Sequence, residues 1–158
     1  EPEAVNLKLH PYRLCLVKNA WYLIGRPSDS PEPRTFRVAR FKTLRMLDQP
    51  ADVPEGFDLK AYFGNAWAVY RGDKTYDIEI WFTPDTAKIV TETVWHGTQK
   101  PTFHNDGSVT LAFQVDGLEE ITNWVLGWSG RAKVIQPPEL RGRVTEKLRA
   151  ALELNSGG

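Results

Sequence analysis

Three arginines recur at every third position of one segment: Arg34, Arg37 and Arg40. A guanidinium group offers planar hydrogen-bond donors that suit phosphate oxygens and base edges, and its flat face also stacks on aromatic rings. On a straight strand Arg34 and Arg40 share one face and Arg37 points to the other, so a common site requires a bend. The spacing alone is equally compatible with a solvated basic strand. The three arginines are candidates for binding an anionic ligand.

The distribution of charge also indicates an anionic partner for the N-terminal part. The chain has 158 residues and a formal net charge of zero. Residues 1–47 carry nine Lys and Arg against four Asp and Glu, whereas the remaining residues carry eleven against sixteen. Such asymmetry suggests that the partner meets the N-terminal half.

Residue patterns typical of catalysis or metal binding are missing from the sequence. The three histidines, His10, His96 and His104, are far apart, and the single cysteine, Cys15, lies between leucines in an apolar strand. They do not make a zinc site. There is no GxSxG, no phosphate-cradling glycine loop and no HExxH motif. We therefore expect no metal, no cofactor and no enzymatic activity.

The composition is that of a globular protein, with 41% hydrophobic and 25% charged residues. No apolar run approaches the roughly 20 residues that span a bilayer. The start Glu1-Pro2-Glu3 does not resemble a secretion signal. We expect a cytoplasmic protein without a membrane partner.

The elements that position the arginines are predicted to be β-strands. Residues 11–26 form two β-rich runs around the turn Lys18-Asn19, which indicates a hairpin. Three prolines make 27–33 a loop. Residues 34–47 then alternate as a half-buried strand does, and the phase changes at 39–42, which predicts a bulge or bend there.

The rest of the chain predicts a linker and a second unit. Prolines and a glycine mark a linker at 49–75, with a short helix capped by Asp58. Trp124 and Trp128 share one helical face, which predicts core residues, with a dimer contact as the alternative. The expected elements, in β-α-β-β-α-β order with one more helix at the end, are strand 76–82, helix 84–94, strands 99–104 and 108–115, helix 118–128, strand 131–136 and helix 138–154.

Three blocks of residues in sequence resemble the WYL-domain family of bacterial transcription regulators. They are His10-Pro11-Tyr12-Arg13-Leu14, then Trp21-Tyr22-Leu23, then Arg34-Thr35-Phe36-Arg37-Val38-Ala39-Arg40-Phe41. The second half resembles the C-terminal extension that follows WYL domains. The resemblance covers roughly residues 7–150.

The resemblance implies an α+β fold with two domains. Residues 1–48 would form a Sm-like or SH3-like β-barrel, 49–75 the linker, and 76–154 a ferredoxin-like domain with a C-terminal helix. Family members open the barrel with one further strand, so we expect this barrel to be incomplete. A strand from a second chain would then pair with its open edge, unless that edge lies in solvent.

The resemblance also implies a site and a function. The barrel would bind a nucleotide or single-stranded nucleic acid through Arg34, Arg37 and Arg40, with hydroxyls from Tyr12 and Tyr22. His10 would either contact phosphate or serve as a turn residue, and both tyrosines could instead be ordinary barrel residues. Trp21 is expected to support the barrel.

Occupancy of the site would be relayed to an upstream winged helix-turn-helix domain that binds DNA, in a regulator that is expected to be a homodimer. The alternative function is an assembly module that holds two regulators together without a small ligand.

Overall fold

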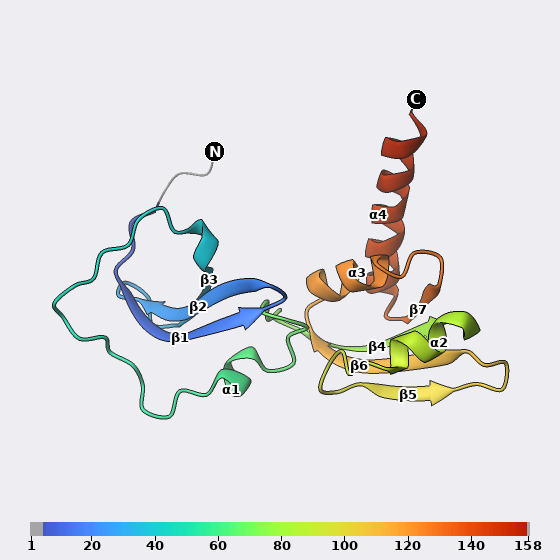
Figure 1. The fold of residues 1–158 in the computed structure, drawn as a ribbon, viewed down its shortest axis with the longest axis horizontal. Helices are drawn as coiled ribbons and strands as arrows, with labels where there is room; N and C mark the ends of the chain where they lie inside the picture. Colours follow the sequence, from blue (N-terminus) through green and yellow to red (C-terminus); the bar gives the residue numbers. More distant parts are fainter. Residues whose placement is uncertain (1–4, 158) are drawn as a thin grey trace. The chain divides into compact units, whose positions relative to one another are not determined.

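The computed structural model describes residues 5–157 and is a mixed α+β structure with two antiparallel sheets. The chain divides into two compact units, unit 1 up to Phe63 and unit 2 from Gly64 (Figure 1). The predicted α+β class is confirmed. Unit 1 contains β1 (Leu9–Val17), β2 (Ala20–Pro27), β3 (Arg34–Arg37), the 3-10 helix η1 (Val38–Arg40) and α1 (Leu59–Phe63). Unit 2 contains β4 (Thr75–Phe82), α2 (Pro84–Thr91), β5 (Lys100–Phe103), β6 (Val109–Asp116), α3 (Glu119–Leu126), β7 (Ala132–Gln136) and α4 (Pro138–Ser156).

The sheet of unit 1 has the strand order β1-β2-β3. Lys18 and Asn19 join β1 to β2 with φ angles of 47° and 62°. Two consecutive residues with positive φ are the mark of a type I′ turn, whose twist matches that of the flanking strands. The predicted hairpin is confirmed.

The third strand is shorter than its alternating sequence predicts. β3 ends at Arg37, η1 follows, and residues 41–57 contain no helix or strand. Leu44 and Met46, which the alternation placed on a buried face, are 77% and 96% exposed. The bend at η1 overlaps the region where the sequence predicted one. The prediction of a strand over 34–47 is wrong beyond Arg37. β3 pairs only with β2, and a strand persists only where its backbone finds a partner.

One face of this sheet carries a small aromatic core. Tyr12 is an extra residue at a bulge in β1, and it is buried together with Ile24 of β2. Its ring lies 5.0 Å from that of Phe57, which lies 5.8 Å from that of Tyr62 in α1. The Tyr62 hydroxyl is hydrogen-bonded to the hydroxyl of Thr35 in β3 at 3.0 Å. The segment around α1 is thereby fixed to β1 and β3.

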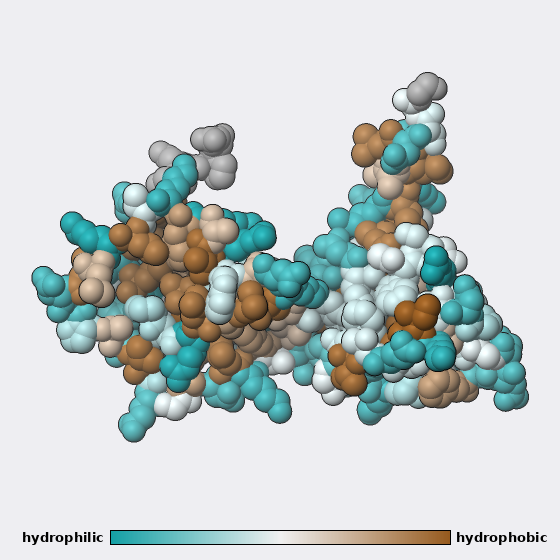
Figure 2. All heavy atoms as spheres, viewed as in Figure 1, coloured by the Kyte–Doolittle hydropathy of each residue, from teal (hydrophilic) through white to brown (hydrophobic). Residues whose placement is uncertain are grey.

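The opposite face of the sheet is apolar and exposed. Leu16 and Trp21 are cross-strand partners that are 59% and 50% exposed, and Leu14 in the next row is 58% exposed. Apolar surface is visible over unit 1 in Figure 2. Trp21 was expected to support a barrel. Within the described residues no second sheet layer covers its side chain, because the three strands form a single open sheet.

Unit 2 has the predicted β-α-β-β-α-β order of elements, followed by α4. Its four antiparallel strands lie in the order β5-β6-β4-β7. Alternate side chains of β4 and β6 form one buried face, since Ile78, Ile80 and Phe82 stand opposite Phe113, Leu111 and Val109. α2 and α3 complete this core, to which they contribute Ala87, Val90, Ile121 and Val125. Trp124 and Trp128 pack against it, which confirms the prediction of core residues.

Only the first half of α4 belongs to the core of unit 2. Leu140 is fully buried and Val144 packs against the core, whereas Leu148 and Leu152 are 46% and 68% exposed. In Figure 1 the C-terminal half of α4 projects away from the remainder of unit 2. No helix in the described part of the chain is long and apolar enough to cross a membrane.

Candidate nucleic-acid interface

The pairing of β2 with β3 brings two of the predicted site residues together. Tyr22 and Arg37 are direct cross-strand partners and therefore share one face of the sheet. Arg37 is exposed and Tyr22 is half-buried. On the other side of Tyr22 the partner is Cys15, whose thiol donates to the carbonyl oxygen of Tyr22 at 3.6 Å. Burial raises the pKa of the Cys15 thiol, which favours its protonated form.

Arg34 lies on the other face of the sheet, and Arg40 lies beyond the end of β3. Arg34 stands opposite Gly25, three positions from Arg37 along β3, and so points to the other face of the sheet. Arg40 is the last residue of η1. Arg37, at the N-cap of this turn, is still extended, with φ −74° and ψ 119°. The pairing of β2 with β3 therefore joins Arg37 to Tyr22 and leaves Arg34 on the other face.

The arginine side chains are free to meet an anion. All three are exposed, and within residues 5–157 no ion pair involves Arg34, Arg37 or Arg40. Arg13 joins the same surface, because it is exposed and stands opposite Ile24, two positions from Tyr22 on β2. Arg13 was not predicted from the sequence, since a bulge at Tyr12 changes which residues of β1 share a face. Its only signal was its place in the first of the three WYL-like blocks.

Tyr12 and His10 belong to a hydrogen-bond network beside this surface. The Tyr12 hydroxyl accepts a hydrogen bond from Arg26 Nε at 3.2 Å, and Arg26 also pairs with Asp52 at 2.7 Å. The hydrogen bond with Tyr12 is the main cause that raises the pKa of Arg26. His10 Nδ1 accepts the amide hydrogen of Asp52 at 2.9 Å, and its Nε2 is 3.1 Å from the hydroxyl of Ser28. Both residues thus hold the 49–57 loop to the sheet.

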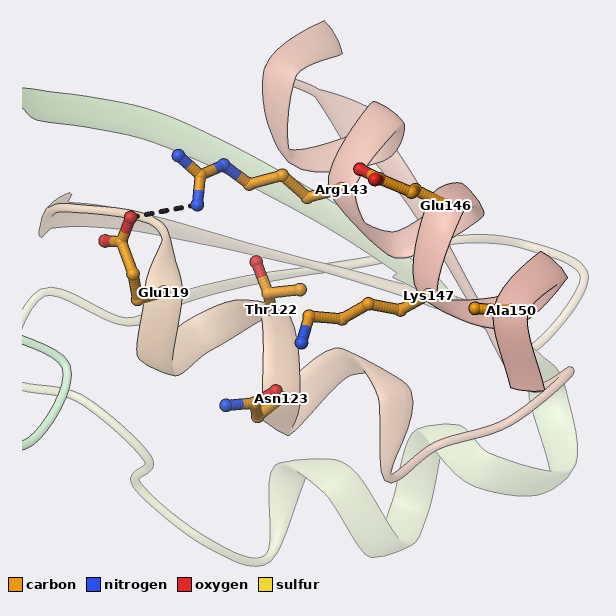
Figure 3. Close-up of a pocket in the computed structure, with 7 residues that line it drawn as sticks. All are labelled: Glu119, Thr122, Asn123, Arg143, Glu146, Lys147 and Ala150. Carbon is orange, nitrogen blue, oxygen red and sulfur yellow. Dashed lines mark hydrogen bonds and ion pairs between the residues drawn. The ribbon is translucent and has the colours of Figure 1, made fainter. Parts of the chain in front are cut away.

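Unit 2 contains a polar groove between α3 and α4, shown in Figure 3. Arg143 donates to the carboxylate of Glu119 at 2.9 Å across the groove, so its charge is already compensated. The hydroxyl of Thr122 donates to the carbonyl oxygen of Leu118. Within residues 5–157, no group of three His, Cys, Asp or Glu side chains is placed to hold a metal ion. The surface around Tyr22 and Arg37 therefore remains the better candidate.

Comparison with known proteins identifies both parts of the chain. The WYL domain model matches residues 1–46, and the WCX domain model matches residues 74–152. Protein PafB of Mycobacterium tuberculosis (strain H37Rv) and that of Mycobacterium bovis are each 25% identical over 154 residues, which is 95% of this chain and 45% of PafB. The chain thus spans less than half the length of these relatives.

Among solved structures, proteasome accessory factor B/C (PafBC) of Arthrobacter aurescens aligns with a TM-score of 0.45 and 17% identity, over 95% of this chain and 23% of that one. The assignment to a family comes from the two domain models, which together match most of the sequence. The chain belongs to the WYL-domain family, with a WCX domain following its WYL domain.

Proposed function

We propose that this chain is the ligand-sensing and regulatory part of a DNA-binding transcriptional regulator, and that unit 1 binds single-stranded nucleic acid. The observation that carries the proposal is the placement of Tyr22 beside Arg37 on neighbouring strands, with Arg13 exposed on the same face. An aromatic ring flanked by guanidinium groups offers a stacking surface for a base and charged donors for the phosphates beside it. A single nucleotide would use the same groups.

Several finer features belong to the same proposal. The three strands of unit 1 would be part of a Sm-like barrel within residues 1–48, followed by the linker 49–75. The strand order of unit 2 supports a ferredoxin-like domain at 76–154. The whole protein would be a cytoplasmic homodimer with a winged helix-turn-helix domain, and its role would be regulatory rather than catalytic. Relay to that domain requires two states that the ligand binds unequally.

Replacing Arg37 by Ala tests the interface. We expect R37A to weaken binding of a labelled single-stranded oligonucleotide by about 1–3 kcal/mol, the range of a charge-assisted contact. The melting temperature should barely change, because the side chain is exposed in the free protein. Fluorescence anisotropy at about 50 mM salt measures the affinity, and a salt series gives the number of phosphate contacts.

The matched control removes the same charge elsewhere. Arg149 is exposed on α4 in unit 2, so R149A should bind as the unaltered chain does. Equal affinity of R37A and the unaltered chain would refute the interface. Equal losses in R37A and R149A would mean that net charge alone attracts the oligonucleotide.

An assembly module is the second candidate, and the exposed face formed by Leu14, Leu16 and Trp21 favours it. Exposed apolar patches of this kind often mark contacts between proteins. Sedimentation separates the two functions. If the chain is an assembly module, Leu16→Ser should change its oligomeric state, and neither the variant nor the unaltered chain should bind the oligonucleotide. If it is a sensor, R37A should lose oligonucleotide binding while its oligomeric state stays the same.

A further inference from the structure

Residues 64–74, which join α1 to β4, form an irregular loop that we name the strap. Asp116, at the end of β6, holds both ends of it. The buried carboxylate of Asp116 accepts the amide hydrogen of Asn65 at 3.1 Å and pairs with Arg71 at 3.3 Å. Its backbone nitrogen donates to the carbonyl oxygen of Asn65, and its backbone oxygen accepts from the amide of Gly72.

The middle of the strap is held by one carboxylate. Glu120 Oε2 accepts the amide hydrogens of three consecutive residues, Ala68 at 2.8 Å, Val69 at 3.1 Å and Tyr70 at 3.2 Å. Consecutive amides that converge on an anion form a nest, and hydrogen bonds to an ionised acceptor are stronger than neutral ones. Glu120 therefore fixes the backbone conformation of the strap.

One apolar side chain of the strap enters the core of unit 2. Trp67 is 7% exposed. Its ring lies 4.9 Å from that of Trp124 and 5.3 Å from that of Phe113, and it stacks on His96 at 5.6 Å with an interplanar angle of 5°. His96 Nε2 in turn lies 3.3 Å from the carbonyl oxygen of Ala66. The closed strap thus completes an aromatic cluster that the sheet and helices leave open on one side.

The strap and the sheet are held largely by different interactions. β4 and β6 pair along the whole of Thr75–Phe82 through their own backbone register, and only Asp116 at the end of β6 is shared with the strap. The strap itself has no helix or strand, and Tyr70 and Arg71 are exposed. A segment without helix or strand opens locally at a lower free energy than global unfolding, and here the apolar cost of opening is that of withdrawing Ala66 and Trp67 from the core. An opening that frees Trp67 and the three amides does not require the sheet to separate.

We propose that the strap opens as a unit while the sheet of unit 2 stays folded, and that Glu120 sets how often it opens. This inference rests on the proposed regulatory function in one respect. The strap is the segment of unit 2 that directly follows unit 1 in the sequence, so an open and a closed state would give the relay its two-state element.

Hydrogen exchange of the strap amides, followed by mass spectrometry without any ligand, tests the proposal. Glu120→Gln keeps the shape of the side chain and removes its charge, so we expect residues 66–70 to exchange roughly tenfold faster or more. Peptides from β4 and β6 should exchange at the unaltered rate. Trypsin gives a second readout, because Arg71 and Lys74 lie in the strap and cleavage there should accelerate equally.

The neighbouring carboxylate supplies the matched control. Glu119 precedes Glu120 on the same helix and pairs with Arg143 instead of the strap. Glu119→Gln should leave exchange at residues 66–70 unchanged. If Glu120→Gln accelerates the strap and the sheet equally, or leaves the strap unchanged, the proposal is overturned.

A second variant, Gly72→Ala, disturbs the strap at its contact with Gly117 instead of at Glu120. A Cβ atom at Gly72 would lie 2.6 Å from the Cα of Gly117. This distance is too short for two carbon atoms, so one of the two backbone segments must move. Gly72→Ala should therefore also open the strap and speed its exchange. If the strap amides of Gly72→Ala are protected from hydrogen exchange as strongly as the sheet amides, the proposal is again overturned. Because no oligonucleotide is used, failure of the proposed function leaves this result intact.

Discussion

Replacing Trp124 by Ala is expected to lower the free energy of unfolding by about 3–5 kcal/mol, the range for truncating a large aromatic core residue. Trp124 touches five other aromatic rings, at centroid distances from 4.9 to 5.9 Å. Neighbours on the sheet, on α3 and in the strap would border the cavity left behind, so no single movement could fill it. Urea unfolding monitored by circular dichroism measures the loss.

Trp124→Phe is the control for this prediction. Among the described residues the buried indole N–H of Trp124 has no hydrogen-bond acceptor. Phe keeps much of the ring and removes the unpaired donor, which offsets part of the cost of lost volume. We expect it to cost less than half of the Ala value. If Trp124→Ala leaves stability unchanged and instead shifts a dimer to a monomer, the side chain belongs to an interface rather than to the core.

The second large effect is expected at Asp116. Asp116→Ala leaves the hydroxyl of Thr75 and the amide of Asn65 without their acceptor, and it leaves Arg71 without its counter-ion. A hydrogen bond to a charged group contributes about 1.5–3 kcal/mol, and water replaces part of each one because Thr75 is exposed and Asn65 half-buried, so we expect a loss of about 2–4 kcal/mol. Urea unfolding measures it. A loss below about 0.5 kcal/mol, the usual range for a surface substitution, would contradict the role given to this carboxylate.

The carboxylate of Asp116 also makes the free energy of unfolding depend on pH in the acid range. The hydrogen bond from Thr75 lowers the pKa of Asp116 below its ordinary value, and the amide of Asn65 and the charge of Arg71 act in the same direction. Since the folded pKa lies below the unfolded one, the folded state binds fewer protons. The stabilisation is complete above the unfolded pKa of about 3.9 and is lost as the pH falls through the folded value.

Asp116→Asn tests this acid dependence. Asn cannot ionise, so the unfolding free energy of the variant should vary less with pH below about 4 than that of the unaltered chain. Glu119 also has a lowered pKa, caused first by its own backbone amide and then by Arg143, and it contributes with the same sign. Glu119→Gln is therefore the reference for a more exposed carboxylate. Parallel acid profiles for Asp116→Asn and the unaltered chain would show that Asp116 is not the group responsible.

Local signals in the sequence are sufficient to predict the elements of unit 2 and the hairpin of unit 1. Alternation along β4 and β6, Thr83 followed by Pro84 at the start of α2, and the turn Lys18-Asn19 are such signals, because backbone preferences of neighbouring residues decide these features. The three WYL-like blocks likewise indicate the family, since the order and spacing of residues are properties of the chain alone.

Which side chains meet depends instead on the tertiary structure. β3 ends at Arg37 because the extent of a strand depends on its partner, which alternation cannot reveal. Pairing with β2 sets Tyr22 beside Arg37, and the bulge at Tyr12 brings Arg13 to the same face. Residues 64–74 carry only the signals of a linker, yet Asp116 and Glu120, about fifty positions later, fix them to unit 2. Hydrogen bonds over such separations follow from the packing of whole elements, and no local pattern records them.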